Sequence, residues 1–221
     1  GLSKKHIHDA CHAALKRLQV EYLDLFFCHR PDPETPVEET VYAMNDLLQQ
    51  GKIMYWGTSE WSAKEIKEAF KCAEKYNLRG PSMEQPQYNI LHRDRFEKEY
   101  KTIFKKYKIG STIWSPLASG ILTGKYIQKI PKVSRFKVKG YEWLADSMEE
   151  LDVKKIEKVI DVSKQLNMKP SQLSILWCLK NKNVSTVILG ASKISQLKEN
   201  INSLDYSNLV TNEIIEEINN Y

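Results

Sequence analysis

The residue types best suited to chemistry lie together in residues 114–126, which read WSPLASGILTGKY. They combine a flat aromatic ring, Trp114, with small residues, two glycines and one cation, Lys125. The apolar run 109–114 ends here, so we expect a buried strand whose carboxyl end opens into a glycine-bearing loop. Such a loop suits a large ligand with a ring to stack and phosphates to hold. It also fits an ordinary strand-to-loop turn, so the rest of the chain must decide between the two interpretations.

The rest of the chain alternates between strand and helix patterns. Apolar runs predict strands at residues 22–29, 53–56, 82–88, 110–114 and 186–189, of which the third is the most polar. Between them apolar residues follow helical spacing, and the expected helix starts are Ser3, Thr35–Pro36, the capping boxes Ser62–Glu65 and Ser147–Glu150, Pro170, Ser192 and about Thr211. No linker interrupts the pattern. We therefore expect residues 1–221 to form a single domain with a parallel sheet and crossover helices.

Two architectures fit this alternation, an open doubly wound sheet and a (β/α)8 barrel. In both, ligands bind at the carboxyl ends of the strands. Polar residues collect there in this sequence, namely His29, Ser59, Gln85, Trp114–Ser115 and residues 190–192. No GxGxxG motif follows a strand, which weakens the open dinucleotide-binding sheet, but five strands are too few to close a barrel of eight. Either the sheet is open or about three strand–helix units are missing from the chain.

Composition places the chain among soluble globular proteins. Its 221 residues are 42% hydrophobic and 28% charged, which is ordinary for a protein with a buried core. The mean hydropathy is −0.49 and no apolar run is long enough to span a membrane, so we expect no membrane insertion. The net charge of +5 is mild and its lysines alternate with glutamates, as in residues 64–68. This pattern argues against nucleic-acid binding.

The four cysteines indicate the compartment. They are widely spaced and form no CxxC pair, so we expect buried, reduced thiols rather than disulfides or a metal site. The N-terminal residues also lack the apolar segment of a secretory signal. Both observations favour a cytoplasmic location.

Eight short motifs in unbroken order resemble the aldo-keto reductase superfamily and, within it, the branch of voltage-gated potassium channel β subunits. They are RPDP at 30–33, WGTS at 56–59, Glu84–Gln85, WSPLA at 114–118, GKY at 124–126, Ser134–Arg135, LGAS at 189–192, and Gln196 with Glu199–Asn200. The resemblance implies an α/β fold, a (β/α)8 TIM barrel of which this chain covers about the last five strand–helix units. It resolves the choice of architecture in favour of the barrel.

The resemblance also implies that NADPH binds and that a hydride passes between it and an aldehyde or ketone. By analogy with the family, Trp114 stacks on the nicotinamide, while Ser59 and Gln85 hydrogen-bond its carboxamide. The other implied cofactor contacts are Ser115, Pro116, Leu117, Ala118 and Ser119 in the pyrophosphate loop with Lys125 as its cation, Arg135, Gly190, Ser192 and Gln196 around the adenosine 2′-phosphate, and Glu199 and Asn200 at the adenine. A guanidinium fork and a helix that begins at Ser192 would both suit a phosphate.

The family's reduction uses Asp, Tyr, Lys and His, and only the last has a match here. The first three belong to strand–helix units that precede this chain, and none of its eleven tyrosines stands at a matching position. The catalytic candidate is therefore His29, whose neutral imidazole would orient the substrate carbonyl. A histidine at the end of a strand also fits a simple cap of the turn that follows.

Two functions remain open from the sequence. His29 favours a reductase, since the channel subunits carry Asn at that position, whereas the overall likeness favours a non-enzymatic, cofactor-sensing regulatory subunit that docks on a membrane channel. A third possibility is that the chain alone neither closes a barrel nor catalyses. Glu60 also departs from the resemblance, because channel subunits carry Arg there and many reductases carry Asn. Relatives assemble as fourfold rings, which implies a homotetramer.

Overall fold

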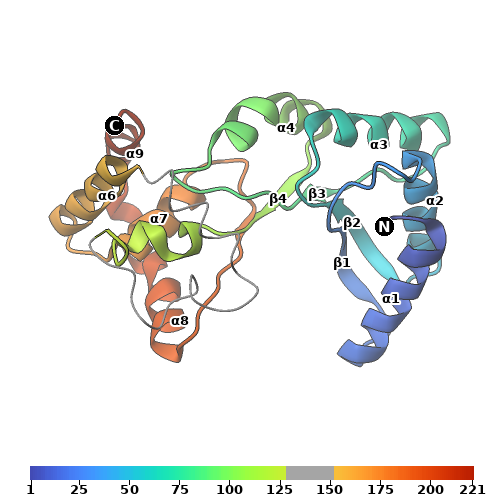
Figure 1. Ribbon diagram of the computed structural model, residues 1–221, viewed down its shortest axis with the longest axis horizontal. Helices are drawn as coiled ribbons and strands as arrows, with labels where there is room; N and C mark the ends of the chain where they lie inside the picture. Colours follow the sequence, from blue (N-terminus) through green and yellow to red (C-terminus); the bar gives the residue numbers. More distant parts are fainter. Residues whose placement is uncertain (128–151) are drawn as a thin grey trace. The chain divides into compact units, whose positions relative to one another are not determined.

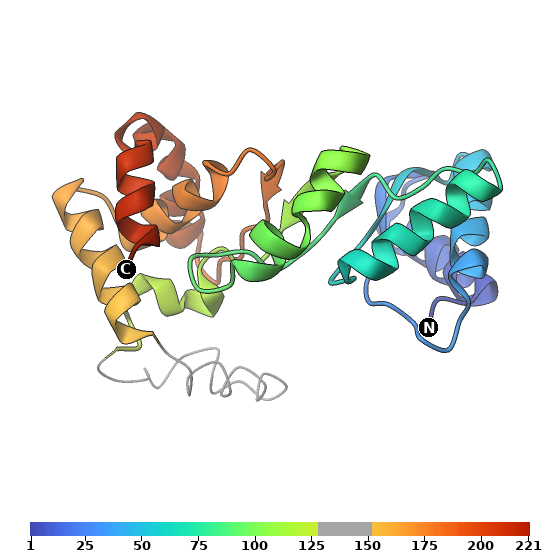
Figure 2. The same ribbon diagram turned by 90° about the horizontal axis from the view of Figure 1, so that it is seen from above.

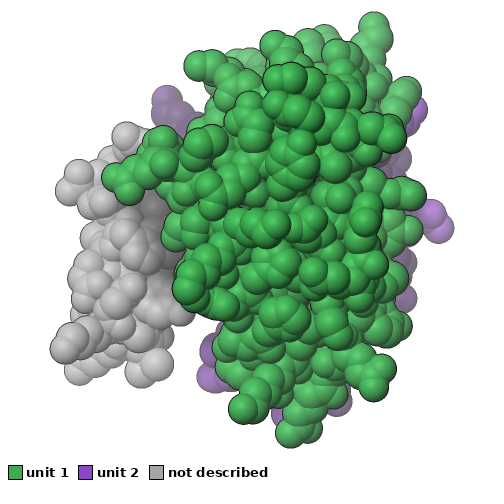
Figure 3. Space-filling model, turned by 90° about the vertical axis from the view of Figure 1, so that its right-hand side faces the viewer, with its two compact units in different colours: residues 1–86, 94–112 green, residues 87–93, 113–221 purple. Residues whose placement is uncertain are grey.

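The computed structural model describes residues 1–127 and 152–221. Two of the sequence predictions, Arg135 and the capping box Ser147–Glu150, lie outside these residues. The described chain divides into two compact units (Figure 3). The first unit comprises residues 1–86 and 94–112, and the second comprises residues 87–93 and 113–221. That the whole chain forms a single domain stays a prediction.

In the described part of the chain, five short strands form one sheet in the order β1-β2-β3-β4-β5. The first three neighbouring pairs, β1 with β2, β2 with β3 and β3 with β4, are parallel, as the alternation of strands and helices predicts. The strands labelled in Figure 1 are β1 (Leu23–Cys28), β2 (Ile53–Thr58), β3 (Met83–Glu84) and β4 (Gly110–Ile113). The last strand is β5 (Thr186–Val187).

Strands β3 and β5 are shorter than their sequence patterns predict. In β3 the ladder covers only Met83 and Glu84, and two residues later comes Pro86, which has no N–H to donate to a neighbouring strand. After β5, the ladder continues as a single hydrogen bond from Ile188 N to Ile113 O (2.8 Å). The residues that follow both strands leave the regular ladder, apart from the isolated bridge between Gln87 and Trp114.

In the first unit, the helices bury one face each beside the sheet, and α2 contacts α1, α3 and β2 (Figure 1). Ser3 caps α1 by accepting from His6 N (3.3 Å), and Ser62 with Glu65 forms the predicted capping box of α3. The predicted cap Thr35 is wrong: α2 begins at Val37 after Pro36, and the Thr35 hydroxyl donates to Asp32 instead (2.7 Å). The helices are α1 (Lys4–Leu18), α2 (Val37–Gln49), α3 (Ala63–Lys75), a π-helical segment (Arg95–Glu99) and α4 (Lys101–Tyr107).

In the second unit, α7 is the central helix, and every residue from Ser171 to Cys178 is buried. It contacts α6, α8 and two 3-10 helices (Figure 2). The helix α6 is capped by Asp152, which accepts from Lys155 N (3.0 Å). The elements are the 3-10 helix Ala118–Thr123, α6 (Val153–Gln165), α7 (Pro170–Leu179), α8 (Ile194–Ile201), the 3-10 helix Asn202–Leu209 and α9 (Asn212–Asn219).

Helix α8 departs from its prediction at its start. The sequence predicts a beginning at Ser192, but the helix begins at Ile194 and its N-cap is Lys193. Its apolar residues are also exposed, with Ile194 at 76% and Ile201 at 53%. The helical spacing of the apolar residues therefore predicts the helix itself but does not predict whether its apolar face is buried.

The cysteines and the lengths of the helices agree with the composition. All four cysteines are buried and free of disulfides. Among the described residues, no helix is both long enough and apolar enough to cross a bilayer.

Candidate functional site

Three of the predicted site residues lie side by side at one edge of the sheet. His29, Ser59 and Gln85 directly follow the last residues of β1, β2 and β3. The parallel register pairs Cys28 with Thr58 and Thr58 with Glu84, so the residues that follow these positions leave the sheet at the same level. This edge is the carboxyl end of the strands, where the sequence predicts them.

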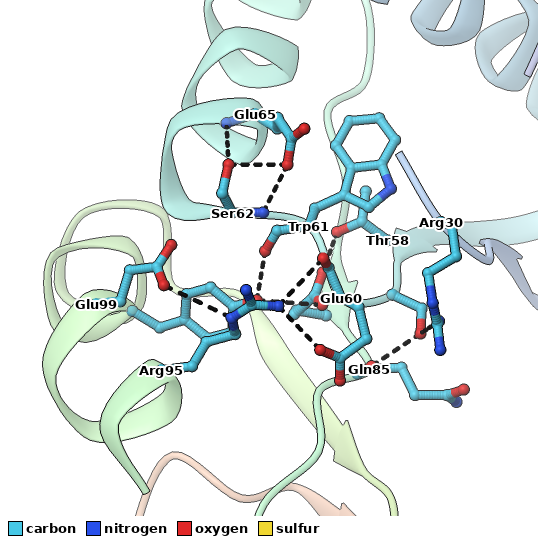
Figure 4. Close-up of polar contacts among 12 residues, drawn as sticks. Arg30, Thr58, Glu60, Trp61, Ser62, Glu65, Gln85, Arg95 and Glu99 are labelled. Atoms are coloured by element: carbon cyan, nitrogen blue, oxygen red, sulfur yellow. Dashed lines mark hydrogen bonds and ion pairs between the residues drawn. The ribbon is translucent and has the colours of Figure 1, made fainter. Parts of the chain in front are cut away.

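Ser59 and Gln85 are joined by one hydrogen bond, and each makes another to a neighbouring residue (Figure 4). Ser59 Oγ donates to Gln85 O (2.9 Å) and accepts from Arg30 Nη1 (3.2 Å). Gln85 Nε2 donates to Thr112 Oγ1 (3.3 Å), which leaves its Oε1 as the accepting end of the amide. The edge thus presents two oxygen acceptors and one guanidinium donor, which is the complement of a primary carboxamide.

His29 lies on the exposed part of this edge. Among the residues that the structure describes, its imidazole makes no hydrogen bond, whereas its backbone oxygen accepts from Arg30 Nη1 (2.6 Å). The turn that follows is fixed by Asp32, which accepts from Leu2 N (2.7 Å), Glu34 N (3.1 Å) and Thr35 Oγ1. These hydrogen bonds, the one from Leu2 N first, lower the pKa of the Asp32 carboxyl to about 2. The turn therefore does not depend on the His29 ring, which the sequence left as a candidate cap.

The turn after Ser59 contains a left-handed residue and an ion pair. Glu60 has a φ of 60°, and its carboxylate pairs with Arg95 (Nη1 to Oε2, 2.9 Å) (Figure 4). Arg95 also lies 3.6 Å from Glu99 Oε2, while Glu99 Oε1 accepts from Ala63 N (2.7 Å). The negative charge that Glu60 brings to this position is thus matched by a cation on the π-helical segment.

A buried polar layer lies one residue below the sheet edge. It consists of the ladder neighbours Cys28, Thr58, Glu84 and Ser111, all at 1% exposure or less. Thr58 Oγ1 donates to Glu84 Oε2, and Tyr100 Oη lies 3.5 Å from Glu84 Oε1. Burial raises the pKa of Glu84 to about 7, although the hydrogen bond from Thr58 and the backbone N–H groups of Glu60 and Trp61 oppose that shift. The carboxyl is therefore partly protonated near neutral pH.

The loop that follows β4 lies in the second unit and has an unusual backbone. Ser115, Ala118 and Ser119 have φ values of 56°, 46° and 57°, and the glycines Gly120 and Gly124 are left-handed as well. Non-glycine residues in this region cost about 1–3 kcal/mol each and concentrate where the backbone clamps a ligand. Within the loop, Ser119 N donates to Ser115 Oγ (3.2 Å). A residue with negative φ followed by one with positive φ, as at Leu117 (φ −102°) and Ala118 (φ 46°), is the backbone pattern of concave anion sites.

A cation and an aromatic ring flank this loop. The Lys125 ammonium lies over Gly120, where an added Cβ would meet its Nζ at 2.8 Å, and it is 4.8 Å from the Tyr126 ring centroid. At the other end, Trp114 is half-buried, and its backbone oxygen accepts from Tyr88 N (3.3 Å). The loop thus combines the ring, the small residues and the cation that its sequence predicts.

The residues expected at the adenosine end come from α8 and the segment before it. Ser192 N and Oγ both donate to Gln196 Oε1, at 3.0 Å each. Glu199 accepts from Ser171 Oγ of α7 (2.7 Å), and Asn200 is buried. Ser192 and Gln196 are thus brought together on an exposed surface, as the resemblance implies. The free amide expected at Ser192 is instead occupied, because the helix begins two residues later.

The family model for the aldo/keto reductase family matches residues 1–220. The chain belongs to the aldo/keto reductase family. It is 46% identical over 220 residues to a probable voltage-gated potassium channel subunit beta of Oryza sativa subsp. japonica, across 99% of this chain and 67% of that protein. The corresponding Arabidopsis thaliana protein is 45% identical over the same shares. A putative voltage-gated potassium channel subunit beta of Schizosaccharomyces pombe is 46% identical over 223 residues, across 99% of this chain and 64% of that protein.

Membership in the aldo/keto reductase family implies a (β/α)8 barrel, and the five-stranded sheet with its parallel neighbours is consistent with part of one. The fold predicted from the sequence is thereby confirmed. The chain spans about two thirds of the length of the curated relatives that it matches. Aldo/keto reductases are oxidoreductases that generally bind a nicotinamide dinucleotide.

Sequence reasoning missed four residues around this sheet edge. Arg30, Glu84, Arg95 and Tyr100 hold the turn and its neighbours. Arg30 and Glu84 stand in two of the motifs without an assigned role, and only Glu84 gave a physical signal. Glu84 directly follows Met83 inside a predicted strand. A carboxylate at such a position must either be exposed at the edge of the sheet or be buried with hydrogen-bond partners. The other three reach the site from positions 29 to 39 residues away in the chain.

Proposed function

We propose that this chain is the cofactor-binding part of an NADPH-dependent aldo-keto reductase that transfers a hydride between NADPH and an aldehyde or ketone. The proposal is supported chiefly by one observation, the alignment of His29, Ser59 and Gln85 at the carboxyl edge of three parallel strands. That is where a barrel of this kind binds its substrate.

The residues present fit the parts of the proposed cofactor. In the first unit, Ser59 Oγ and Gln85 Oε1 would accept from the carboxamide N–H group, and Arg30 would donate to its oxygen. In the second unit, the strained loop 115–124 and Lys125 suit the pyrophosphate, and Trp114 offers a ring face. Bound NADPH would supply the hydride.

At the adenosine end, the proposal assigns the extra phosphate to exposed polar residues. Ser192 and Gln196 lie together there, and Arg135, which is outside the described residues, would add a guanidinium. Gly190 precedes them, and the resemblance assigns Glu199 and Asn200 to the adenine. Charge-assisted contacts to this phosphate are worth roughly 1–3 kcal/mol, so we expect NADPH to bind about 5- to 150-fold more tightly than NADH.

His29 is assigned to the substrate carbonyl. Its exposed ring is free of hydrogen bonds to the other described residues, so a neutral imidazole would donate to the carbonyl oxygen and orient it. The proton that the oxygen takes up would come from the Tyr of the family's catalytic set, to which we assign no residue of this chain.

The test is NADPH oxidation by an aldehyde in the full-length protein, with NADPH and NADH affinities measured by tryptophan fluorescence. We expect His29→Ala and His29→Asn to lower the rate about 100-fold without changing the NADPH affinity. The exposed α1 residue His12 provides the control variant His12→Asn, which should keep the full rate. Full rates in both His29 variants would remove its catalytic role, and equal affinities for NADPH and NADH would remove the roles of Arg135, Ser192 and Gln196.

A second candidate is a cofactor-sensing regulatory subunit without enzymatic turnover. It is favoured by the relatives at 45–46% identity, which are named as potassium channel β subunits. Tight NADPH binding without any aldehyde-dependent oxidation would select this function. Under either function we propose a cytoplasmic protein that assembles as a homotetramer, which light scattering of the purified protein would test.

A further inference from the structure

The carboxyl of Glu84 is enclosed at the end of β3, at 0% exposure. Thr58 Oγ1 donates to its Oε2, and Tyr100 Oη lies 3.5 Å from its Oε1. The nearby Arg95 gives its contacts to Glu60 and Glu99 rather than to this carboxyl. A buried carboxylate without a paired cation is costly, so its protonation state matters.

The single proton of the Tyr100 hydroxyl distinguishes the ionised from the protonated form of Glu84. The hydroxyl of Tyr100 has one proton, and it donates this proton to Trp61 O. It therefore presents a lone pair to Glu84 Oε1. An ionised Glu84 would place two lone pairs against each other at 3.5 Å, whereas a protonated Oε1 donates to Tyr100 Oη and completes the network.

Groups from each surrounding element face Glu84 and act in both directions. They are the Cys28 thiol of β1, the Thr58 hydroxyl of β2, the Glu60 carboxylate of the following turn, and Tyr100 with the more distant Arg95 and Glu99 from the π-helical segment and its end. The Thr58 hydroxyl and the backbone N–H groups of Glu60 and Trp61 favour the ionised carboxylate, whereas burial and the Glu60 carboxylate favour the protonated form, and burial is the largest of these effects. Burial raises the pKa of Glu84 to about 7, and the negative charge of Glu60 adds to that rise. Burial, followed by the charge of Glu84, also raises the pKa of Tyr100.

This network lies directly beneath the two carboxamide contacts. Thr58 precedes Ser59 and Glu84 precedes Gln85, and alternating strand residues point to opposite sides. The two pairs are joined across the strands by Gln85 N to Thr58 O (2.8 Å) and Ser59 Oγ to Gln85 O (2.9 Å). At the other end of the turn, Tyr100 Oη donates to Trp61 O, so the network forms hydrogen bonds at both ends of residues 58–61.

We infer that Glu84 is a positioning residue for the nicotinamide end of the cofactor. In its protonated form it joins Thr58 to Tyr100 and fixes the orientation in which Ser59 and Gln85 meet a carboxamide. Loss of the proton replaces a hydrogen bond with repulsion at Tyr100, which loosens the turn and weakens cofactor binding. This inference rests on the proposed function, because the ligand it concerns is the one proposed there.

The experiment is a titration of the full-length protein with NADPH between about pH 6 and about pH 8.5. The wild type is compared with Glu84→Gln, whose neutral amide can accept from Thr58 and donate to Tyr100 as the protonated carboxyl does. We expect the ratio of the wild-type Kd to the variant Kd to rise about tenfold across this range. The phosphate of NADPH titrates equally in both proteins, so the ratio removes its contribution. Glu74→Gln, at an exposed carboxylate on α3, should keep the wild-type profile.

A second variant and a ligand-free measurement separate the possible failures. Tyr100→Phe removes the repelling lone pair as well as the bond to Trp61, so it should bind NADPH weakly with a flattened pH profile. Infrared spectra of the ligand-free wild type minus Glu84→Gln should show a protonated carboxyl at about pH 6 that disappears by about pH 8.5. A constant Kd ratio, with NADPH bound, would overturn the inference and leave the proposed function standing. Absence of NADPH binding at every pH would overturn both, and the infrared titration would then show whether the buried network exists without a cofactor role.

Discussion

The buried carboxyl of Glu84 makes the stability of this protein depend on pH in a predictable direction. The pKa of Glu84 is about 7 in the folded protein, against 4.5 for an ordinary glutamate, because burial disfavours the charged form. Between these two values the folded state holds a proton that the unfolded state has released. The contribution of this group to stability is therefore complete below about pH 4.5 and is lost as the pH rises through about 7.

The size of the effect follows from the same two values. A shift of one pKa unit corresponds to 1.36 kcal/mol, so the folded protein should lose about 3 kcal/mol of unfolding free energy from this group between about pH 4.5 and about pH 8. Other titrating groups add their own dependence. The quantity to compare is therefore the difference between the wild type and Glu84→Gln, in which the group cannot ionise.

Urea unfolding at several pH values, followed by circular dichroism, measures this difference. We expect the variant to gain stability relative to the wild type as the pH rises, by about 3 kcal/mol over the full range. The exposed Glu74→Gln should run parallel to the wild type. If the difference between wild type and Glu84→Gln is the same at about pH 5 and about pH 8, then Glu84 is not a protonated group in the folded protein and the reasoning about Tyr100 is wrong.

Three further predictions test the loop, the fluorescent reporter and a helix cap. Gly120→Ala should weaken NADPH binding, because its φ is 94° and the new Cβ would meet Lys125 Nζ at 2.8 Å. The control is Gly51→Ala, also at positive φ but with open space around it. It should cost only about 1 kcal/mol of stability and leave the NADPH affinity unchanged. Trp114→Ala should abolish most of the fluorescence quenching by NADPH, and an unchanged quench would assign it to another tryptophan. Ser62→Ala should lower the unfolding free energy by about 1 kcal/mol, since it removes the capping box of α3, and urea unfolding without any such loss would contradict that role.

The parts of the fold that sequence reasoning predicts well are those determined locally. The capping box of α3 involves residues three apart, and strand β1 ends at Cys28, shortly before Pro31, which has no N–H for a ladder. The carboxyl-edge placement of His29, Ser59 and Gln85 needed only the strand ends and the rule that parallel strands align them. These features require no knowledge of which distant side chains meet.

The parts that it predicts poorly depend on which of several available partners a side chain or amide takes, and in one case that partner is distant in the chain. Thr35 looks like a cap, but its hydroxyl is taken by Asp32, because the turn that contains both folds back on itself. The start of α8 moves from Ser192 to Ile194, and the Ser192 N–H donates to the Gln196 side chain. Tyr100 reaches Trp61 across 39 residues, and nothing in its own neighbourhood marks it as a partner of the turn.

The layer beneath the sheet edge explains why the site residues and their supports occur as adjacent pairs in the sequence. Side chains alternate along a strand, so the residue before each edge residue points to the opposite side. Cys28 precedes His29, Thr58 precedes Ser59, and the parallel register places Thr58 between Cys28 and Glu84. A change in the buried member therefore reaches the exposed member through one peptide bond and the cross-strand hydrogen bonds. Glu84 is the member of this layer with a pKa near neutrality. The charge beneath the edge therefore changes when Glu84 gains or loses its proton, although Glu84 itself is buried away from any ligand.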